Sequence, residues 1–262
     1  EANPDSVTVE SLARLLDAGV TRVSFGVQSL AEHVLATLDR THTPGRALEA
    51  IAAAHQVGFT HISADLIYAT PGETDEDLTS SVRAVLDAGV DHLSAYSLII
   101  EPGTRMAAQV SRGELPAPDD DLAAHRYEII DTLARDHGLE WYEVSNWAKP
   151  GGECQHNLGY WRGGDWWAIG PGAHGYLGGE PGVRWWNIKH PRAYADSVNA
   201  GRPPVAGWEL IDEPTRILES VMLGLRLREG IDSTLLPAVT DPVVQRHVGD
   251  GLLTVGQGRI RL

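Results

Sequence analysis

One pattern recurs along the first half of the chain. A stretch whose apolar residues have helical spacing ends at a glycine, and a run of β-branched or aromatic residues follows. A glycine at a helix C-terminus followed by a buried strand is typical of the helix-to-strand joint in parallel α/β architectures. The pattern recurs with glycines at 19, 58, 89 and 138 and apolar runs at 23–27, 62–68, 93–100 and 141–144. These repeats predict a βα barrel, whole or partial, or a doubly wound sheet.

Polar residues at the ends of the apolar runs favour the barrel, because barrel active sites are built from the C-terminal ends of strands. Such residues are Gln28, Ser29, Asp65, Tyr96 and Ser97. Each could instead cap a helix or form a hydrogen bond at the barrel rim.

The Asp65 carboxylate at a strand end can accept hydrogen bonds from the hydroxyls or ammonium of a small polar ligand. Glu1 and Arg40 could complete such a site, and Gln28 could donate its side-chain amide. A helix is predicted to begin after Thr74, because three acidic residues there suit the positive N-terminal end of the helix dipole.

The second half of the chain changes character. Residues 151–191 are rich in Gly, Trp and His with little periodicity, which predicts a long functional loop. A strong helix is predicted after Pro214, followed by short helices and a β-hairpin around residues 256–258. The resulting division is a barrel at 1–150, an aromatic and Gly-rich segment at 151–200, and a small helical, winged-helix-like domain at 201–262.

Composition narrows the class of protein. The 262 residues carry a formal net charge of -15, which argues against nucleic acid or anionic lipid as a main partner because both require clustered Lys and Arg. A single cysteine fits a reducing, cytoplasmic setting. No run of about 18 apolar residues is present, so no transmembrane helix is expected. The chain begins without Met and ends within a predicted strand, so we expect a fragment truncated at both termini.

The aromatic segment contains the most distinctive candidate site. Its only cysteine, Cys154, precedes His156, Asn157 and Tyr160 in an HNxxY stretch, and three tryptophans follow at 161, 166 and 167. An imidazole among wide aromatic faces can hold a flat, metal-bearing ring such as heme, with His156 as the iron ligand. The Cys154 thiolate is a rival ligand. Alternatively, His156 and Asn157 cap neighbouring backbone and Cys154 is a small buried residue.

Two other motifs are weak. Residues 170–175 match GxGxxG in form, but the glycines and proline that follow cannot form the helix that a dinucleotide site requires. A tight turn that presents backbone amides is favoured there, with His174 lining the same cleft as the HNxxY stretch. Neither HExxH nor paired CxxC occurs in the sequence, which makes a zinc site improbable.

Taken together, a series of motifs closely resembles one family. It resembles the radical S-adenosylmethionine (SAM) proteins related to oxygen-independent coproporphyrinogen III oxidase, and within them the HNxxY stretch matches the HemW-type heme chaperones and is not expected in true oxidases. The motifs span nearly the whole chain in order: EANP at 1–4, SFGVQS at 24–29, Arg40, DLIY at 65–68, PGET at 71–74, EPGT at 101–104, YEVSN at 142–146 and HNLGYW at 156–161.

The resemblance implies an α/β fold with a partial TIM-type barrel of the radical SAM type, a 4Fe–4S cluster and SAM at the barrel mouth, and a small C-terminal domain. The tail is shorter than the family's winged-helix domain would need. His156 carries over as the heme ligand and Tyr160 as its motif partner, while catalytic residues stay unassigned. The SAM-contacting residues that carry over are Glu1, Gln28, Arg40 and Asp65, with Ile67 and Ile99 as weaker backbone or packing contacts.

One departure from the family concerns the cluster. The family binds it through a CxxxCxxC loop, which would lie before Glu1, and Cys154 alone cannot supply three thiolates. As given, this chain should neither hold the cluster nor perform radical chemistry.

The sequence is compatible with three functions. The favoured one is a heme chaperone that binds heme and delivers it to apo-proteins, respiratory ones among them, with the cluster and SAM in a structural or regulatory part. A homodimer is one predicted assembly of this chaperone. The alternative is an oxidase that decarboxylates the propionates of coproporphyrinogen III. The third is a catalytically dead scaffold.

Overall fold

A computed structural model describes residues 1–40, 43, 45–236 and 242–262. It divides the chain into two compact units, Glu1–Glu153 and Cys154–Leu262. The predicted domain boundaries at residues 150 and 200 stay predictions.

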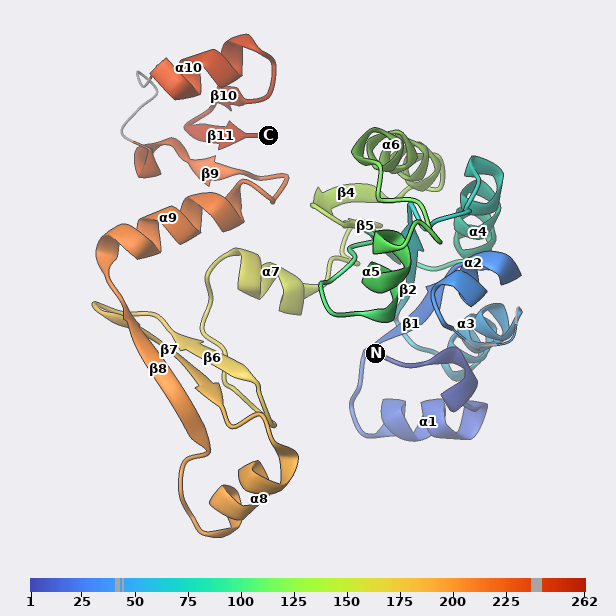
Figure 1. Ribbon diagram of the computed structural model, residues 1–262, viewed down its shortest axis with the longest axis horizontal. Helices are drawn as coiled ribbons and strands as arrows, with labels where there is room; N and C mark the ends of the chain where they lie inside the picture. The colour runs from blue at the N-terminus through green and yellow to red at the C-terminus, as the bar shows by residue number, and fades with distance from the viewer. Residues whose placement is uncertain (41–42, 44, 237–241) are drawn as a thin grey trace. The chain divides into compact units, whose positions relative to one another are not determined.

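The first unit is built on a five-stranded sheet of order β1-β2-β3-β5-β4 (Figure 1). The strands β1 (Arg22–Gln28), β2 (His61–Tyr68) and β3 (His92–Ser97) are parallel to their neighbours. Helices α1 (Val9–Asp17), α3 (Arg46–Val57) and α4 (Asp75–Asp87) precede these three strands in turn. The first three predicted helix-to-strand joints are therefore confirmed.

The fourth joint differs from the expectation. Helix α6 (Asp120–Asp136) does lead into β4 (Glu140–Glu143). However, β4 turns back at once into β5 (Asn146–Ala148), and β5 inserts between β3 and β4 with antiparallel pairing on both sides. The sheet is thus a partial barrel whose last two strands form a hairpin.

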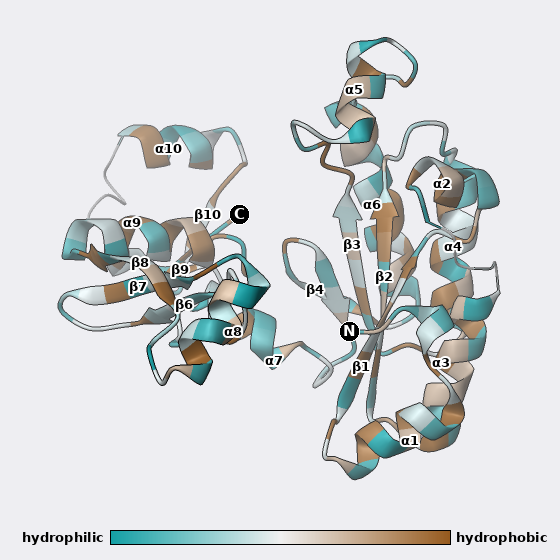
Figure 2. Cartoon of the chain, turned by 60° about the horizontal axis from the view of Figure 1, so that its bottom comes forward, coloured by the Kyte–Doolittle hydropathy of each residue, from teal (hydrophilic) through white to brown (hydrophobic). Residues whose placement is uncertain are grey.

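The two faces of this sheet have different neighbours. Strand β1 alternates strictly between buried and half-buried positions, and its buried face joins a core that includes Phe25, Leu66, Leu93 and Trp147. Helices α3, α4 and α6 contact the strands, and Figure 2 shows α1, α3 and α4 along one flank of β1, β2 and β3. The opposite face carries polar side chains. The shorter elements of this unit are η1 (Pro4–Ser6), α2 (Glu32–Thr37) and α5 (Arg105–Ser111).

Helix α4 begins where the sequence predicts. The Thr74 hydroxyl accepts from the backbone N–H of Asp77 at 3.1 Å, and the Asp77 carboxylate accepts from the backbone N–H of Thr74 at 2.9 Å. Arg126 of α6 adds a buried ion pair, with its guanidinium 3.1 Å from Glu73 and 3.1 Å from Asp75. These contacts fix the start of α4 against α6.

The second unit corrects the predicted loop over residues 151–191. That stretch contains α7 (Gln155–Trp161), β6 (His174–Leu177) and β7 (Gly182–Asn187), and β6 and β7 form an antiparallel sheet with β8 (Val205–Ile211). Two glycines of this sheet are required by packing. A Cβ on Gly175 would collide with the Trp185 ring, and a Cβ on Gly207 would collide with the Trp186 ring.

The remainder of the second unit matches the sequence pattern. The predicted helix after Pro214 is α9 (Glu213–Gly224), and the predicted hairpin is β10 (Thr254–Gly256) with β11 (Arg259–Arg261). Strand β9 (Ile231–Asp232) completes this sheet, and Ile231, Val244, Leu253 and Ile260 form a small core. The other elements are α8 (Pro191–Asn199), η2 (Ser233–Leu235) and α10 (Pro242–Gly249). Residues 237–241 lie outside the described residues.

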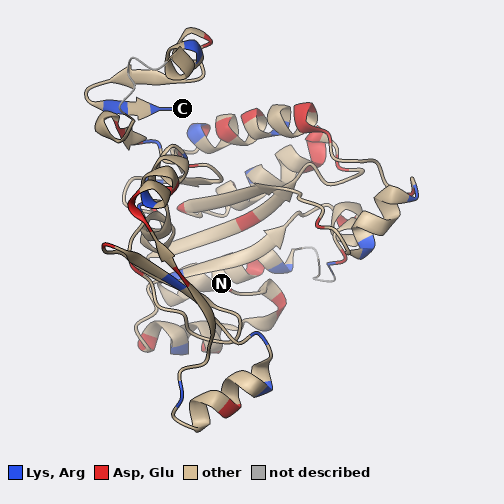
Figure 3. Ribbon diagram, turned by 60° about the vertical axis from the view of Figure 1, so that its left-hand side comes forward, with Lys and Arg blue, Asp and Glu red and all other residues tan. Residues whose placement is uncertain are grey.

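Acidic residues outnumber basic ones, giving the formal net charge of -15. Figure 3 shows Asp and Glu spread over many helices and loops. Within the described ranges, every helix is too short or too polar to cross a membrane.

Candidate functional site

A row of polar side chains crosses the helix-free face of the first sheet. The strand register places Asp65 of β2 beside Ser94 of β3, Ser94 beside Asn146 of β5, and Asn146 beside Glu143 of β4. The neighbour of Asp65 on β1 is Gly26, so the row begins at a position without a side chain. The sequence pattern placed Asp65 at the end of an apolar run, but the residue lies in the middle of β2. The helix-free face of the sheet accommodates a polar side chain at this position.

Asp65 is held by hydroxyl groups. The Ser24 hydroxyl lies 2.7 Å from each Asp65 carboxylate oxygen, and Ser94 forms a further hydrogen bond. Burial raises the pKa of Asp65, the two serines oppose that shift, and the negative charge of Glu1 adds to it. The backbone N–H of Ala2 donates to the carbonyl of Ser24 at 2.8 Å, and Ser24 is the residue whose hydroxyl contacts Asp65. This contact holds Glu1, the neighbour of Ala2, near Asp65.

The side chain of Gln28 lies at the β1 end of the polar row, next to Gly26. The register of β1 against β2 shifts between Gly26 and Gln28, and Gln28 has a left-handed backbone with φ of 63°. Its side-chain Nε2 lies 3.0 Å from where a Cβ on Gly26 would stand. The missing side chain at Gly26 therefore makes room for the Gln28 amide on the same face as Asp65.

The other predicted SAM contacts are placed differently. Ile67 is half-buried on the same face as Asp65, since side chains two apart on a strand share a face. Ile99 is 76% exposed beyond β3. Arg40 is exposed after α2, and its backbone N–H donates to Leu35. Glu1, Gln28, Asp65 and Ile67 are thus brought together, whereas the contacts given for the described residues do not join Arg40 or Ile99 to them.

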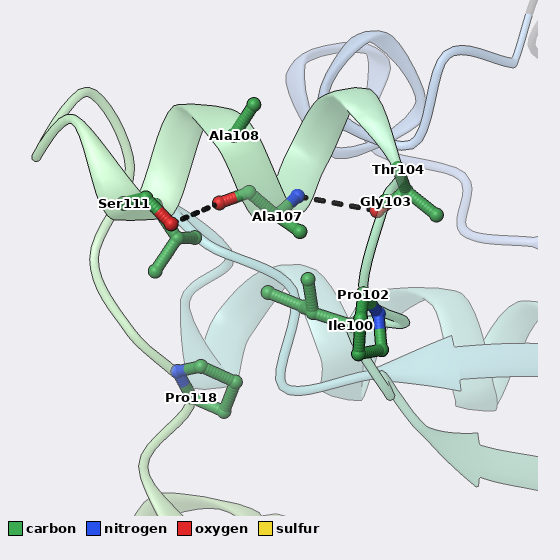
Figure 4. A pocket seen from close by; sticks show the side chains of 9 residues that line it. Ile100, Pro102, Gly103, Thr104, Ala107, Ala108, Ser111 and Pro118 are labelled. Atoms are coloured by element: carbon green, nitrogen blue, oxygen red, sulfur yellow. Dashed lines mark hydrogen bonds between the residues drawn. The ribbon is translucent and has the colours of Figure 1, made fainter.

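A separate cavity of about 630 Å³ lies beside α5 (Figure 4). Its lining is mostly small or apolar, and the Ser111 hydroxyl and the Ala107 N–H are already used within the helix, donating to the Ala107 carbonyl and the Thr104 hydroxyl. The lining residues are Ile100, Pro102, Gly103, Thr104, Ala107, Ala108, Val110, Ser111 and Pro118. The predicted SAM contacts are not among them, and the lining carries no titratable group.

The HNxxY stretch forms helix α7, with His156 in its first turn. His156 and Tyr160 are one helical turn apart, and their rings meet edge to face with centroids 4.8 Å apart. Trp166 continues the row at 4.9 Å from Tyr160, and Tyr176 of β6 follows at 5.0 Å from Trp166. The imidazole is exposed at the end of a row of contacting aromatic rings.

Neighbouring residues of the motif have other surroundings. Cys154 is the half-buried N-cap residue of α7. The Trp161 ring lies under the Arg226 guanidinium at 5.8 Å, and Trp167 meets Trp185 at 5.0 Å. The predicted tight turn over residues 170–175 is present, with positive φ at Gly170 and Gly172. His174 begins β6 just after that turn, and its carbonyl accepts from the Trp166 indole at 3.1 Å.

Metal-binding groups are sparse. Within residues 1–40, 43, 45–236 and 242–262, no three His, Cys, Asp or Glu side chains gather in a way that could hold a metal ion. The sequence has one cysteine, so its residues do not fit a cluster that needs three thiolates. A single exposed imidazole, in contrast, is sufficient as an axial ligand of heme iron.

Glu143, Asn146 and Tyr96 lie on the polar face but were not predicted as site residues. Glu143 and Asn146 had entered only as letters of the YEVSN motif, and Tyr96 only as a strand end. Their shared row depends on the pairing of β3 with β5, for which the sequence offered no local signal.

Comparison with known proteins agrees with this geometry. A family model described as the radical SAM superfamily matches residues 1–85. The structure of coproporphyrinogen III oxidase HemN from Escherichia coli, a radical SAM enzyme, resembles this chain with a TM-score of 0.78 at 20% identity, over 100% of this chain and 64% of that one. The partial barrel thus defines the class, a radical SAM-type α/β fold.

The curated relatives narrow the family. A heme chaperone HemW from Mycobacterium tuberculosis (strain CDC 1551 / Oshkosh) is 52% identical over 99% of this chain and 68% of its own length. The heme chaperone HemW of Bacillus subtilis (strain 168) is 37% identical over 88% of this chain and 60% of its own length. The chain belongs to the HemW-type heme chaperone family. Heme appears in the names of these relatives, and SAM appears in the description of the matching family model.

Proposed function

We propose that this chain binds heme through His156 and passes it to apo-proteins, respiratory ones among them, as part of a longer protein that carries a 4Fe–4S cluster and SAM. The exposed His156 imidazole at the end of the aromatic row carries the proposal. Heme is the cargo in this function, so the site must release it as well as hold it.

The surroundings of His156 support a ligand that is held but accessible. The edge-to-face contact with Tyr160 restricts the imidazole without covering it. Tyr160 is itself 38% exposed, which leaves aromatic surface beside the imidazole for an apolar porphyrin ring. Cys154 precedes the helix and is half-buried, which makes it the weaker candidate as iron ligand.

The polar row on the first sheet supports the SAM part of the proposal. Asp65 can accept from the hydroxyls of an adenosyl group, Gln28 can donate its amide, and Ile67 adds an apolar contact. Glu1 supplies a second carboxylate for an ammonium group. Arg40 and Ile99 stay predicted contacts. No step is assigned to the cluster, since the residues of this chain do not fit it.

The oxidase alternative has no observation of its own in its favour. Two relatives, 52% and 37% identical to the chain, are named heme chaperones, and the oxidase structure at 20% identity shows only a shared fold. Heme chaperone is therefore the function that we propose. A homodimer stays a prediction.

The heme proposal can be tested by titrating heme into the purified chain and following its Soret absorbance. His156→Ala is expected to weaken heme binding about tenfold or more, because the axial ligand is lost. His190→Ala is the matched control, since this exposed histidine lies in the same unit but at the N-terminus of α8. Equal heme affinity in the wild type and in His156→Ala would contradict the assignment.

A further inference from the structure

A second exposed imidazole lies at the other end of the aromatic row. The row that starts at His156 ends at Tyr176 on β6, and His174 is two residues before Tyr176 on the same strand. Side chains two apart on a strand share a face, so His174 and Tyr176 project from the same face of the β6-β7-β8 sheet. The His174 side chain is exposed, and the proposed function gives it no role.

The aromatic row also fixes the backbone of His174. The Trp166 indole N–H donates to the His174 carbonyl at 3.1 Å. Trp166 and Tyr176 exchange two backbone hydrogen bonds of 2.9 Å. The rings that extend from His156 thus hold the strand segment that carries His174.

The His174 imidazole lies beside a flat aromatic surface. Trp186 of β7 is its cross-strand neighbour, and the two ring centroids are 6.0 Å apart with the ring planes inclined by 30°. The next position in the same register is Gly207 of β8, and the Trp186 ring fills the space that a Cβ on Gly207 would need. Because Gly207 has no side chain, the indole lies flat across that strand.

Lys189 supplies a positive charge near this surface. Its Cγ lies 3.4 Å from where a Cβ on Gly172 would stand, and Gly172 is two residues before His174. The backbone joins the same two segments, since the Asn187 N–H donates to the Ala173 carbonyl at 2.9 Å. Lys189 is exposed, and no carboxylate forms an ion pair with it in the part of the chain that the structure describes.

Heme matches this combination of groups. Its iron takes an imidazole as axial ligand, and its flat macrocycle packs against aromatic rings. Its propionates are carboxylates, which a lysine ammonium can bind. His174, Trp186 and Lys189 offer one group of each kind within the second unit.

We propose that His174 is the iron ligand of a second heme position, with Trp186 as its aromatic wall and Lys189 as the partner of a propionate. The inference rests on the proposed function and deepens it, because a chaperone must release its cargo as well as hold it. Heme that leaves His156 can be taken up at the other end of the same aromatic row. The iron–nitrogen bond to His156 breaks and one to His174 forms, with no change in the oxidation state of the iron.

The test titrates ferric heme into the intact chain and measures dissociation constants from the Soret absorbance. In His156→Ala the residual binding is expected to depend on His174, so His156→Ala/His174→Ala should bind heme about tenfold more weakly than His156→Ala. Lys189→Met in the His156→Ala background is expected to weaken binding about threefold, because one exposed ion pair is lost. Lys149→Met, at an exposed lysine of the first unit, is the matched control and should leave binding unchanged.

Iron-free protoporphyrin IX separates iron ligation from stacking. It has the same flat ring and carboxylates, so removal of His174 from His156→Ala should change its affinity less than about twofold. Equal losses of heme and protoporphyrin binding would overturn the role of His174 as iron ligand. His55→Ala in the same background controls for the loss of an exposed imidazole, because His55 lies on α3 of the first unit.

The single and double variants distinguish this inference from the proposed function. Weaker heme binding in His156→Ala with a further loss in the double variant supports both. Weaker binding in His156→Ala with no further loss, or with no measurable residual binding, overturns the second position and leaves the proposed function standing. Unchanged binding in His156→Ala with a loss in His174→Ala overturns His156 as ligand and keeps His174. Failure of the wild-type chain to bind heme, or unchanged binding in every variant, overturns both.

Discussion

His92 is a buried imidazole at the start of β3, and its environment keeps it neutral. Its two ring nitrogens lie 2.8 Å from the Ser63 hydroxyl and 2.7 Å from the Tyr142 hydroxyl. Burial lowers the pKa of His92 to about 3, and the positive charge of Arg22 contributes. His92 is therefore protonated at a lower pH in the folded chain than in the unfolded chain.

This difference predicts an acid-sensitive fold. The unfolded histidine takes up a proton near its reference pKa of 6.5, whereas the folded one does so only near 3. Stability is therefore intact above about pH 6.5 and falls as the pH is lowered toward 3. Between pH 7 and pH 5 the loss from this group is about 2 kcal/mol in the free energy of unfolding, measured by denaturant titration.

The His92→Gln variant isolates this contribution. It is less stable at neutral pH because the side chain repacks, but its stability should change less between pH 7 and pH 5 than that of the wild type. An identical pH dependence in the two proteins would assign the acid sensitivity to other groups.

At the scale of single elements, the N-terminus of α4 depends on Thr74. The capping box satisfies backbone N–H groups that the helix itself cannot pair. Thr74→Ala is expected to lower the free energy of unfolding by about 1 kcal/mol. Thr74→Ser keeps the hydroxyl and should retain most of that stability. Equal losses in the two variants would show that the hydroxyl is not what stabilises the helix.

The elements that the sequence predicted are those whose signals are local. The start of α4 follows from Thr74 and its acidic neighbours, and the first three helix-to-strand joints follow from a glycine beside an apolar run. The placement of β5 does not follow from such signals, because its pairing joins Ser94 to Asn146 across 52 positions of sequence. The loop prediction for residues 151–191 was wrong because it rested on Gly-rich composition and weak periodicity, whereas a glycine such as Gly175 lies in a strand and makes room for Trp185.

The same distinction applies to the candidate site. Asp65 and Gln28 could be selected from the sequence as polar residues in or after apolar runs. The bulge that turns the Gln28 amide over Gly26, and the alignment of Asp65 with Glu143, are properties of the paired strands. His156 and Tyr160 could be paired from their spacing alone, because residues four apart meet on a helix.

For the whole molecule, the division into two units predicts separate stabilities. Each unit has its own buried cluster, with Ile51 in the first and Ile260 in the second, and both side chains are 0% exposed. Ile260→Ala is expected to cost about 2–5 kcal/mol locally. Hydrogen exchange should then accelerate within Cys154–Leu262 while Glu1–Glu153 keeps its protection.

Ile51→Ala is the reciprocal variant, with accelerated exchange expected in the first unit only. Acceleration across both units in either variant would mean that the chain unfolds as one cooperative body.

Two backbone positions at the edge of the polar face bear on how this fold could change. Gln28 and Ala69, at the ends of β1 and β2, adopt φ of 63° and 60°, a conformation that costs about 1 kcal/mol or more outside glycine. Glycine would relieve that cost at either position. At 69 nothing but a methyl group would be lost, whereas at 28 the gain in stability would remove the amide that faces Asp65. Glycine at position 69 should therefore raise the stability of the fold without affecting ligand recognition. Glycine at position 28 should raise stability at the expense of ligand binding.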